Sequence, residues 1–195
     1  MNGQELSAKE KIIHATIFCM EREGIQGVTI RKIARKAGVN SAAINYYFGT
    51  KEKLLDKALR HTLDEMSSMP EEILDAEGLD PRARLQDFFV ALMEGIFRYP
   101  GITRAHLYST IFEYDYNTLF VRRFNILLED LMSKMRGVEA KDKKKDLRVT
   151  LVQIISAIVL PALMPRFVRP FAKVNFEDAK TRKIYVASLM DHYFK

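Results

Sequence analysis

The feature that most constrains this chain is a pair of short helical patterns joined at a glycine. Residues 30–37 (IRKIARKA) carry their apolar side chains at i, i+3, i+4 and i+7, which places one apolar stripe along a helix. Gly38 follows, and glycine adopts the unusual backbone angles of a tight turn at little steric cost. Residues 41–48 (SAAINYYF) then predict a second, very short helix. This order is typical of a helix-turn-helix.

The second short helix has two different sides. Ile44 and Phe48 are spaced i, i+4 and are expected to pack inward. Asn45 lies on the opposite side, and its amide offers the donor and acceptor that suit adenine in the major groove. An alternative is that NYYF only completes a three-helix core; we accept it for Ile44 and Phe48, and partly for Tyr47. The outward set is Ser41, Ala42, Asn45 and Tyr46.

The positive charge is concentrated near the N-terminus. The chain has a net charge of +6, and residues 1–60 hold 11 Lys and Arg against 6 Asp and Glu, whereas residues 61–195 hold 20 against 19. A localised basic surface indicates a polyanionic partner, with nucleic acid first. A lysine-rich solvated surface is the alternative. Within the helix-turn-helix, we expect some of these basic side chains to follow phosphates: Arg31, Lys32, Arg35 and Lys36.

The stretch TIRKIARKAGVNSAAINYYFGTKEKLLDKAL closely resembles the DNA-binding domain of TetR-family transcriptional regulators. The matching elements, in order, are Thr29, Ile33-Ala34, Ala37-Gly38-Val39, Tyr47-Phe48 and Lys51-Glu52-Lys53-Leu54. The resemblance covers about residues 7–60. It implies that the following residues face bases or the DNA backbone: Thr29, Asn40, Ser41, Ala42, Asn45, Tyr46, Tyr47 and Lys51. Asn45 departs from the tyrosine usual in the family, so the operator sequence does not follow from the resemblance.

The whole chain is predicted to be all-α, because no segment shows the alternation of a strand. We expect a helix-turn-helix domain over 1–50 and a helical effector-binding and dimerisation domain over 51–195, connected by the helix that begins at 51. A loop or a frayed helix end is predicted over 67–81 and a charged linker over 138–146. About nine helices are expected, over 7–24, 30–37, 41–48, 51–66, 81–98, 102–113, 117–136, 142–164 and 175–193.

The larger domain is where the resemblance implies an effector pocket and a dimer interface. Between Phe88 and Phe124, 10 of 37 residues are Phe or Tyr, so a pocket here would suit a small hydrophobic or aromatic effector. The alternative for each of these aromatic residues is that it packs in the hydrophobic core and does not line a pocket. The candidate pocket residues are Met93, Phe97, Tyr108, Phe112, Tyr116 and Phe124. The candidate dimer residues are Leu151, Ile155, Ile158, Tyr185 and Leu189, with a larger monomeric core as the alternative.

Several classes of protein are not supported by the sequence. A single cysteine excludes an internal disulfide, and the N-terminus lacks a signal-peptide pattern. The apolar run 151–164 is shorter than the ~20 residues of a membrane span. No metal-ligand set, cofactor motif or catalytic motif is present, so we expect a non-enzymatic, cytoplasmic repressor that binds a palindromic operator as a homodimer. The alternative is a DNA-bound adaptor whose C-terminal domain recruits a protein.

Overall fold

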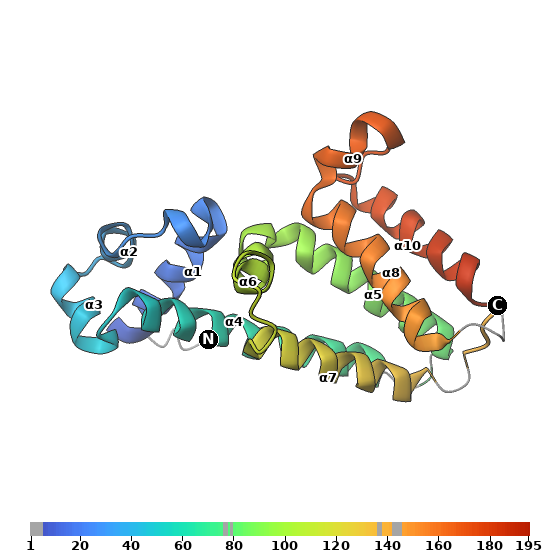
Figure 1. Cartoon of the computed structure of the whole chain (residues 1–195), viewed down its shortest axis with the longest axis horizontal. Helices are drawn as coiled ribbons and strands as arrows, with labels where there is room; N and C mark the ends of the chain where they lie inside the picture. Colours follow the sequence, from blue (N-terminus) through green and yellow to red (C-terminus); the bar gives the residue numbers. More distant parts are fainter. Residues whose placement is uncertain (1–5, 76–77, 79, 136–137, 142–145) are drawn as a thin grey trace. The chain divides into compact units, whose positions relative to one another are not determined.

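The computed structural model describes residues 6–75, 78, 80–135, 138–141 and 146–195 (Figure 1). The described residues form ten helices and no strand, apart from one isolated bridge between Ala140 and Phe194. The prediction of an all-α fold is therefore confirmed. The helices are α1 Ala8–Gly27, α2 Ile30–Ala37, α3 Ser41–Phe48, α4 Lys51–Leu74, α5 Pro81–Arg98, α6 Pro100–Phe112, α7 Leu119–Lys134, α8 Leu147–Leu163, α9 Pro165–Ala172 and α10 Ala179–Tyr193.

The chain folds as two compact units. Unit 1 extends to Met66 and also contains Gly101–Phe120, whereas unit 2 contains Ser67–Pro100 and Val121–Lys195. Packing therefore groups the first part of α4 and nearly all of α6 with the N-terminal helices. The boundary predicted at residue 50 separates a DNA-binding domain from an effector-binding and dimerisation domain. Grouping by packing does not test this division of function, so it stays a prediction.

Unit 1 is built around the inner sides of α1 to α4. Its largest fully buried side chains are at most 1% exposed, and they are Ile12, Met20, Ile33, Ile44 and Leu54. Ser7 begins α1 with a capping box, in which Ser7 and Glu10 satisfy each other's backbone N–H groups. The helical geometry of α1 is interrupted at Gly24 (φ 71°), the residue at which the sequence predicted its end. A further turn continues to Gly27.

Helix α6 joins unit 1 through a carboxylate cap from α1. The Glu21 carboxylate accepts hydrogen bonds from the backbone N–H groups of Gly101 (3.1 Å) and Ile102 (2.9 Å). These are N–H groups that the first turn of a helix leaves without a partner, and the positive end of the helix dipole favours the carboxylate. Ile102 and Ala105 then pack into the core of unit 1.

A buried histidine makes a second connection in unit 1. His106 of α6 is 5% exposed, and its Nε2 lies 2.9 Å from the Thr62 hydroxyl of α4. Its ring stacks on Phe120, with the ring centres 5.3 Å apart. Burial lowers the pKa of His106 to about 4, so the ring is neutral at neutral pH.

Unit 2 places α5 against α8 and α10. Its central side chains are fully buried, and they include Phe89, Met93, Ile158, Val186 and Phe194. One charged residue lies within this apolar surrounding. Arg182 of α10 pairs with the Glu94 carboxylate of α5 through two bonds, of 2.8 and 2.6 Å, and its guanidinium lies 4.2 Å from the centre of the Phe97 ring.

The structure corrects several predicted boundaries. α4 continues to Leu74 through most of the loop predicted over 67–81, because Ile73 and Leu74 pack into the core of unit 2. α7 is shorter than the predicted 117–136, and α10 begins after Asp178 rather than at Asn175 because the Asp178 carboxylate caps it. The first residues of the helix predicted over 142–164 lie outside the described residues, and α8 begins at Leu147 after the Asp146 cap.

The count of about nine helices was also too low, because α9 was missed. Proline usually breaks a helix, yet α9 contains Pro165 and Pro170, and Pro165 occupies the first turn, where its missing N–H needs no partner. Taken singly, none of the described helices has the length and apolar composition of a membrane span; α8 and α9 meet that test only as a pair bent by 99°.

Candidate nucleic-acid interface

Three short-range devices fix the geometry of α2 and α3. The Thr29 hydroxyl accepts from the N–H of Lys32 and begins α2, and the Asn40 side-chain oxygen accepts from the N–H of Ala43 (2.8 Å) and begins α3. Between them Gly38 is left-handed (φ 70°, ψ 31°) and its N–H bonds back to the Ala34 carbonyl. The turn between the two helices is therefore determined by residues within it.

Helix α3 separates its residues into an inner and an outer side, as predicted. Ile44 is 1% exposed and Phe48 is 9% exposed, because both pack into the core of unit 1. Tyr46, by contrast, is 83% exposed and Tyr47 is 43% exposed, with their rings in an edge-on contact at 5.2 Å. Asn45 is exposed beside them. An amide, two phenols and the small side chains of residues 41 and 42 thus form one uncharged surface.

The structure places seven of the eight predicted DNA-contacting residues at the surface and Lys51 half-buried at the start of α4. Two of them have a structural task as well. The side-chain oxygens of Thr29 and Asn40 already accept backbone hydrogen bonds, which leaves the Asn40 amino group to face outward. Their contacts with DNA remain predictions.

The four basic residues of α2 do not play the same part. Lys32 forms an ion pair with Glu23 and donates to the Gly27 carbonyl at 3.0 Å, and Lys36 lies 3.8 Å from the centre of the Phe18 ring. Both lysines therefore hold α2 against α1. Arg31 and Arg35 are exposed and are the better placed pair for phosphates. The sequence could not make this distinction, because Phe18 and Glu23 approach α2 only after folding.

The predicted effector residues are divided between the two units. In unit 2, Met93 is fully buried in the core, Phe97 lies against the Arg182 guanidinium, and Phe124 is half-buried. In unit 1, Tyr108 accepts a hydrogen bond from the Gln26 amide, whereas Phe112 is 67% and Tyr116 is 62% exposed. Their part in effector binding remains a prediction.

The predicted dimer residues lie largely inside one chain. Leu151, Ile155 and Ile158 of α8 are at most 7% exposed, and Leu189 is half-buried. Tyr185 is also half-buried and donates its hydroxyl to the Ala157 carbonyl at 3.0 Å. The apolar side chains that α8 and α10 leave exposed are ones that the helical periodicity did not single out: Val149, Val152, Leu160 and Ile184. Contact between these helices and a second chain stays a prediction.

No metal centre accompanies the interface. In the part of the chain that the structure describes, no three His, Cys, Asp or Glu side chains converge as ligands. His14 and His61, distant in sequence, do meet edge-on at 5.4 Å between α1 and α4.

Comparison with known proteins matches the N-terminal module to a family. Residues 12–58 fit the model described as bacterial regulatory proteins, tetR family. The HTH-type transcriptional regulator BetI of Stenotrophomonas maltophilia is 34% identical over 95 residues, which are 49% of this chain and 46% of the relative. The BetI of Burkholderia lata is 30% identical over 89 residues, 46% of each chain. The alignments thus span about half the length of these curated relatives.

Solved structures resemble the fold over nearly the whole chain. A TetR transcription regulator from Haloarcula marismortui has a TM-score of 0.68 at 21% identity, over 96% of this chain and 98% of that one. The ketosteroid transcriptional regulator KstR2 of Mycobacterium tuberculosis has a TM-score of 0.68 at 19% identity, over 99% and 98%. At these identities the likeness concerns the fold alone, namely an N-terminal helix-turn-helix followed by a helical body.

Proposed function

We propose that this chain, whose residues 12–58 match the TetR-family model, is a TetR-family transcriptional regulator that binds operator DNA and represses transcription. In this proposal it is a regulator and not an enzyme. It acts as a homodimer on a palindromic operator and is released by a small hydrophobic or aromatic effector. Because it acts on DNA, its place is the cytoplasm.

The observation that carries the proposal is the outer side of α3. Asn45 and Tyr46 are exposed on a helix whose inner side is fixed by buried Ile44 and Phe48. A helix whose projecting side chains are small, polar and uncharged can approach base edges closely, while Arg31 and Arg35 on the preceding helix supply the attraction to phosphates. The arrangement therefore suits direct contact with the major groove.

A homodimer follows from the geometry of such recognition. Two copies of α3 must enter successive major grooves, roughly 34–36 Å apart, so a palindromic operator matches a two-fold dimer. The dimer can hold its two α3 helices at different separations, and an effector can bind one of these states more tightly than the other. The affinity for DNA then changes by at most the effector's difference in affinity for the two states.

The experiment measures binding to labelled DNA from upstream of the protein's own gene, by fluorescence anisotropy over a range of salt concentrations. Asn45→Ala should lose about 1–3 kcal/mol of preference for the operator over unrelated DNA. Lys51→Ala should weaken binding to both DNAs equally and reduce the salt slope by about 1. Lys180→Ala removes one positive charge from an exposed side chain of α10 and serves as the control.

Two results would contradict the proposal. One is the absence of salt-sensitive, sequence-selective binding by the unmodified protein. The other is an Asn45→Ala variant that keeps full operator preference, which would remove α3 from base recognition even if DNA binding persists.

A further inference from the structure

A shallow, positively charged hollow lies on unit 2, away from α3 in the sequence. It has a volume of about 570 Å³ and is lined by Arg166, Arg169, Pro170, Lys173 and Asn175, all from α9 and the turn after it. This volume is within the roughly 300–1,000 Å³ of small-molecule sites. None of these residues belongs to the predicted DNA, effector or dimer sets.

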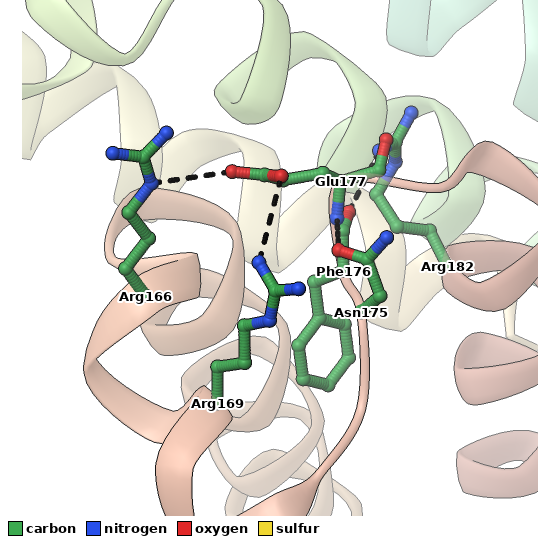
Figure 2. A network of polar contacts seen from close by, with 6 residues as sticks. All are labelled: Arg166, Arg169, Asn175, Phe176, Glu177 and Arg182. Atoms are coloured by element: carbon green, nitrogen blue, oxygen red, sulfur yellow. Dashed lines mark hydrogen bonds and ion pairs between the residues drawn. The ribbon is translucent and has the colours of Figure 1, made fainter.

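The turn that follows α9, which contributes Asn175 to the hollow, is anchored by Arg182. Arg182 donates to the backbone carbonyls of Phe176 (2.8 Å) and Glu177 (3.0 Å), residues that Figure 2 draws beside it. The same guanidinium pairs with Glu94 of α5. Phe176 is 5% exposed and packs edge-on against Tyr185. The turn over 174–178 is therefore tied to the core, and the position of Glu177 is fixed from beneath.

The carboxylate of Glu177, by contrast, binds its two partners loosely. Figure 2 shows it between two arginines, with one oxygen 3.3 Å from Arg166 Nε and the other 3.9 Å from Arg169 Nη1. Charge-assisted bonds of this kind are usually about 2.7–2.9 Å long, the range that Arg182 reaches with Glu94. Exposed ion pairs contribute only about 0–1 kcal/mol, so an incoming anion can displace this carboxylate at small cost.

The hollow also has more positive charge than Glu177 can balance. Residues 164–177 contain three basic residues and one acidic residue. Arg166 and Arg169 are spaced i, i+3 on one side of α9, and Lys173, the left-handed residue that ends the helix, lines the same hollow. Guanidinium groups bind phosphate and carboxylate with paired N–H groups, and Lys173 and Asn175 add further donors.

We propose that this hollow binds the oxyanion group of a small organic molecule, a phosphate monoester or a similar dianion, in place of the Glu177 carboxylate. Its concave form and volume suit a small molecule better than a DNA duplex. The site goes beyond the proposed function and does not depend on it, since its occupation is measured on the free protein without DNA.

The test uses calorimetric titration of the full chain with phenyl phosphate at pH 8 and low ionic strength. One molecule should bind per chain. Arg166→Gln and Arg169→Gln should each weaken binding about tenfold, because each removes a charged donor. Glu177→Gln should strengthen binding about two- to fivefold, because it removes the competing carboxylate. A general attraction to net charge would give the same signs, so a variant that removes a positive charge elsewhere on unit 2 is needed to identify a built site.

Two control variants locate the effect. Phe171→Ala alters a side chain of α9 that is 95% exposed and does not line the hollow, and it should leave the affinity unchanged. Arg148→Gln removes one positive charge from the exposed Arg148–Glu129 pair of unit 2 and should also have little effect. Circular dichroism of each variant verifies that it is folded.

The inference is overturned if phenyl phosphate does not bind, if Arg148→Gln weakens binding as much as Arg169→Gln, or if Glu177→Gln weakens it. It is also overturned if the binding of non-operator duplex DNA depends on Arg166 and Arg169 while the binding of phenyl phosphate does not. Loss of operator binding in the anisotropy experiment leaves this titration unaffected, so the two proposals fail separately.

Discussion

Replacing Gly101 by alanine should destabilise the protein, although alanine is the better helix former. Gly101 lies in the first turn of α6, and a Cβ built there would be 2.2 Å from the carbonyl oxygen of Glu21 and 2.5 Å from its Cα. Ordinary contacts at such atoms are about 3.5 Å long, so α6 and α1 must separate by about 1 Å. The obstructing atoms belong to the backbone and cannot turn aside.

The expected magnitude follows from two opposing terms. Helix propensity favours alanine by about 1 kcal/mol. Overpacking costs about 1–3 kcal/mol, and the same separation lengthens the bonds from Gly101 and Ile102 to the Glu21 carboxylate, each contributing about 1.5–3 kcal/mol. The net loss should be about 2 kcal/mol or more, which lowers the Tm of a chain of this size by about 4–8 °C.

The assay is thermal unfolding followed by circular dichroism, with Gly95→Ala as the matched control. Gly95 lies within α5, and no atom lies within 4 Å of the position that a Cβ would take there. The Gly95→Ala variant should have the same Tm as the unmodified protein or a higher one, because the only effect there is the greater helix propensity of alanine. If Gly101→Ala raises the Tm as Gly95→Ala does, α1 and α6 are not in close contact at Gly101, and the reasoning is refuted.

Three further predictions concern the remaining unusual groups. His106, whose pKa falls to about 4 on burial, is neutral when folded but binds a proton near pH 6.5 when unfolded; stability is full above pH 6.5 and falls by up to about 3 kcal/mol toward pH 4. His106→Gln should flatten that part of the pH dependence measured by urea unfolding, and an unchanged slope would contradict the assignment. Arg182→Ala should cost about 3–5 kcal/mol in the same assay, because Glu94 loses its partner in a largely buried pair; a loss below 1 kcal/mol would refute this. Gly38→Ala should lower the free energy of unfolding by about 1–2 kcal/mol through its left-handed backbone alone, and a neutral result would contradict that strain.

The parts of the fold that could be predicted from sequence are those governed by neighbouring residues. Thr29, Gly38 and Asn40 act within three or four residues of themselves, and the two short helices with the turn at Gly38 were predicted correctly. The bounds of α5 were also correct, since Asp80-Pro81 begins the helix. The inner and outer sides of α3 follow from helical period alone, which is why Ile44 and Asn45 were assigned to the correct sides.

Features that depend on distant residues could not be predicted in this way. The stripe containing Leu151, Ile155 and Ile158 is apolar whether it faces its own chain or a partner, and the structure places it in the core of unit 2. Pro165 and Pro170 end a helix in most settings, but here α9 contains both, with Pro165 in its first turn and Pro170 within it.

Local sequence was enough to predict the helix-turn-helix and its uncharged outer surface, because capping, glycine conformation and helical period act over a few residues. Packing in three dimensions was needed to establish which lysines hold α2 to α1, how Glu21 fixes α6, and how Arg182 of α10 pairs with Glu94 of α5. Each of these depends on side chains brought together from far along the chain, and burial and charge pairing act on distances in space.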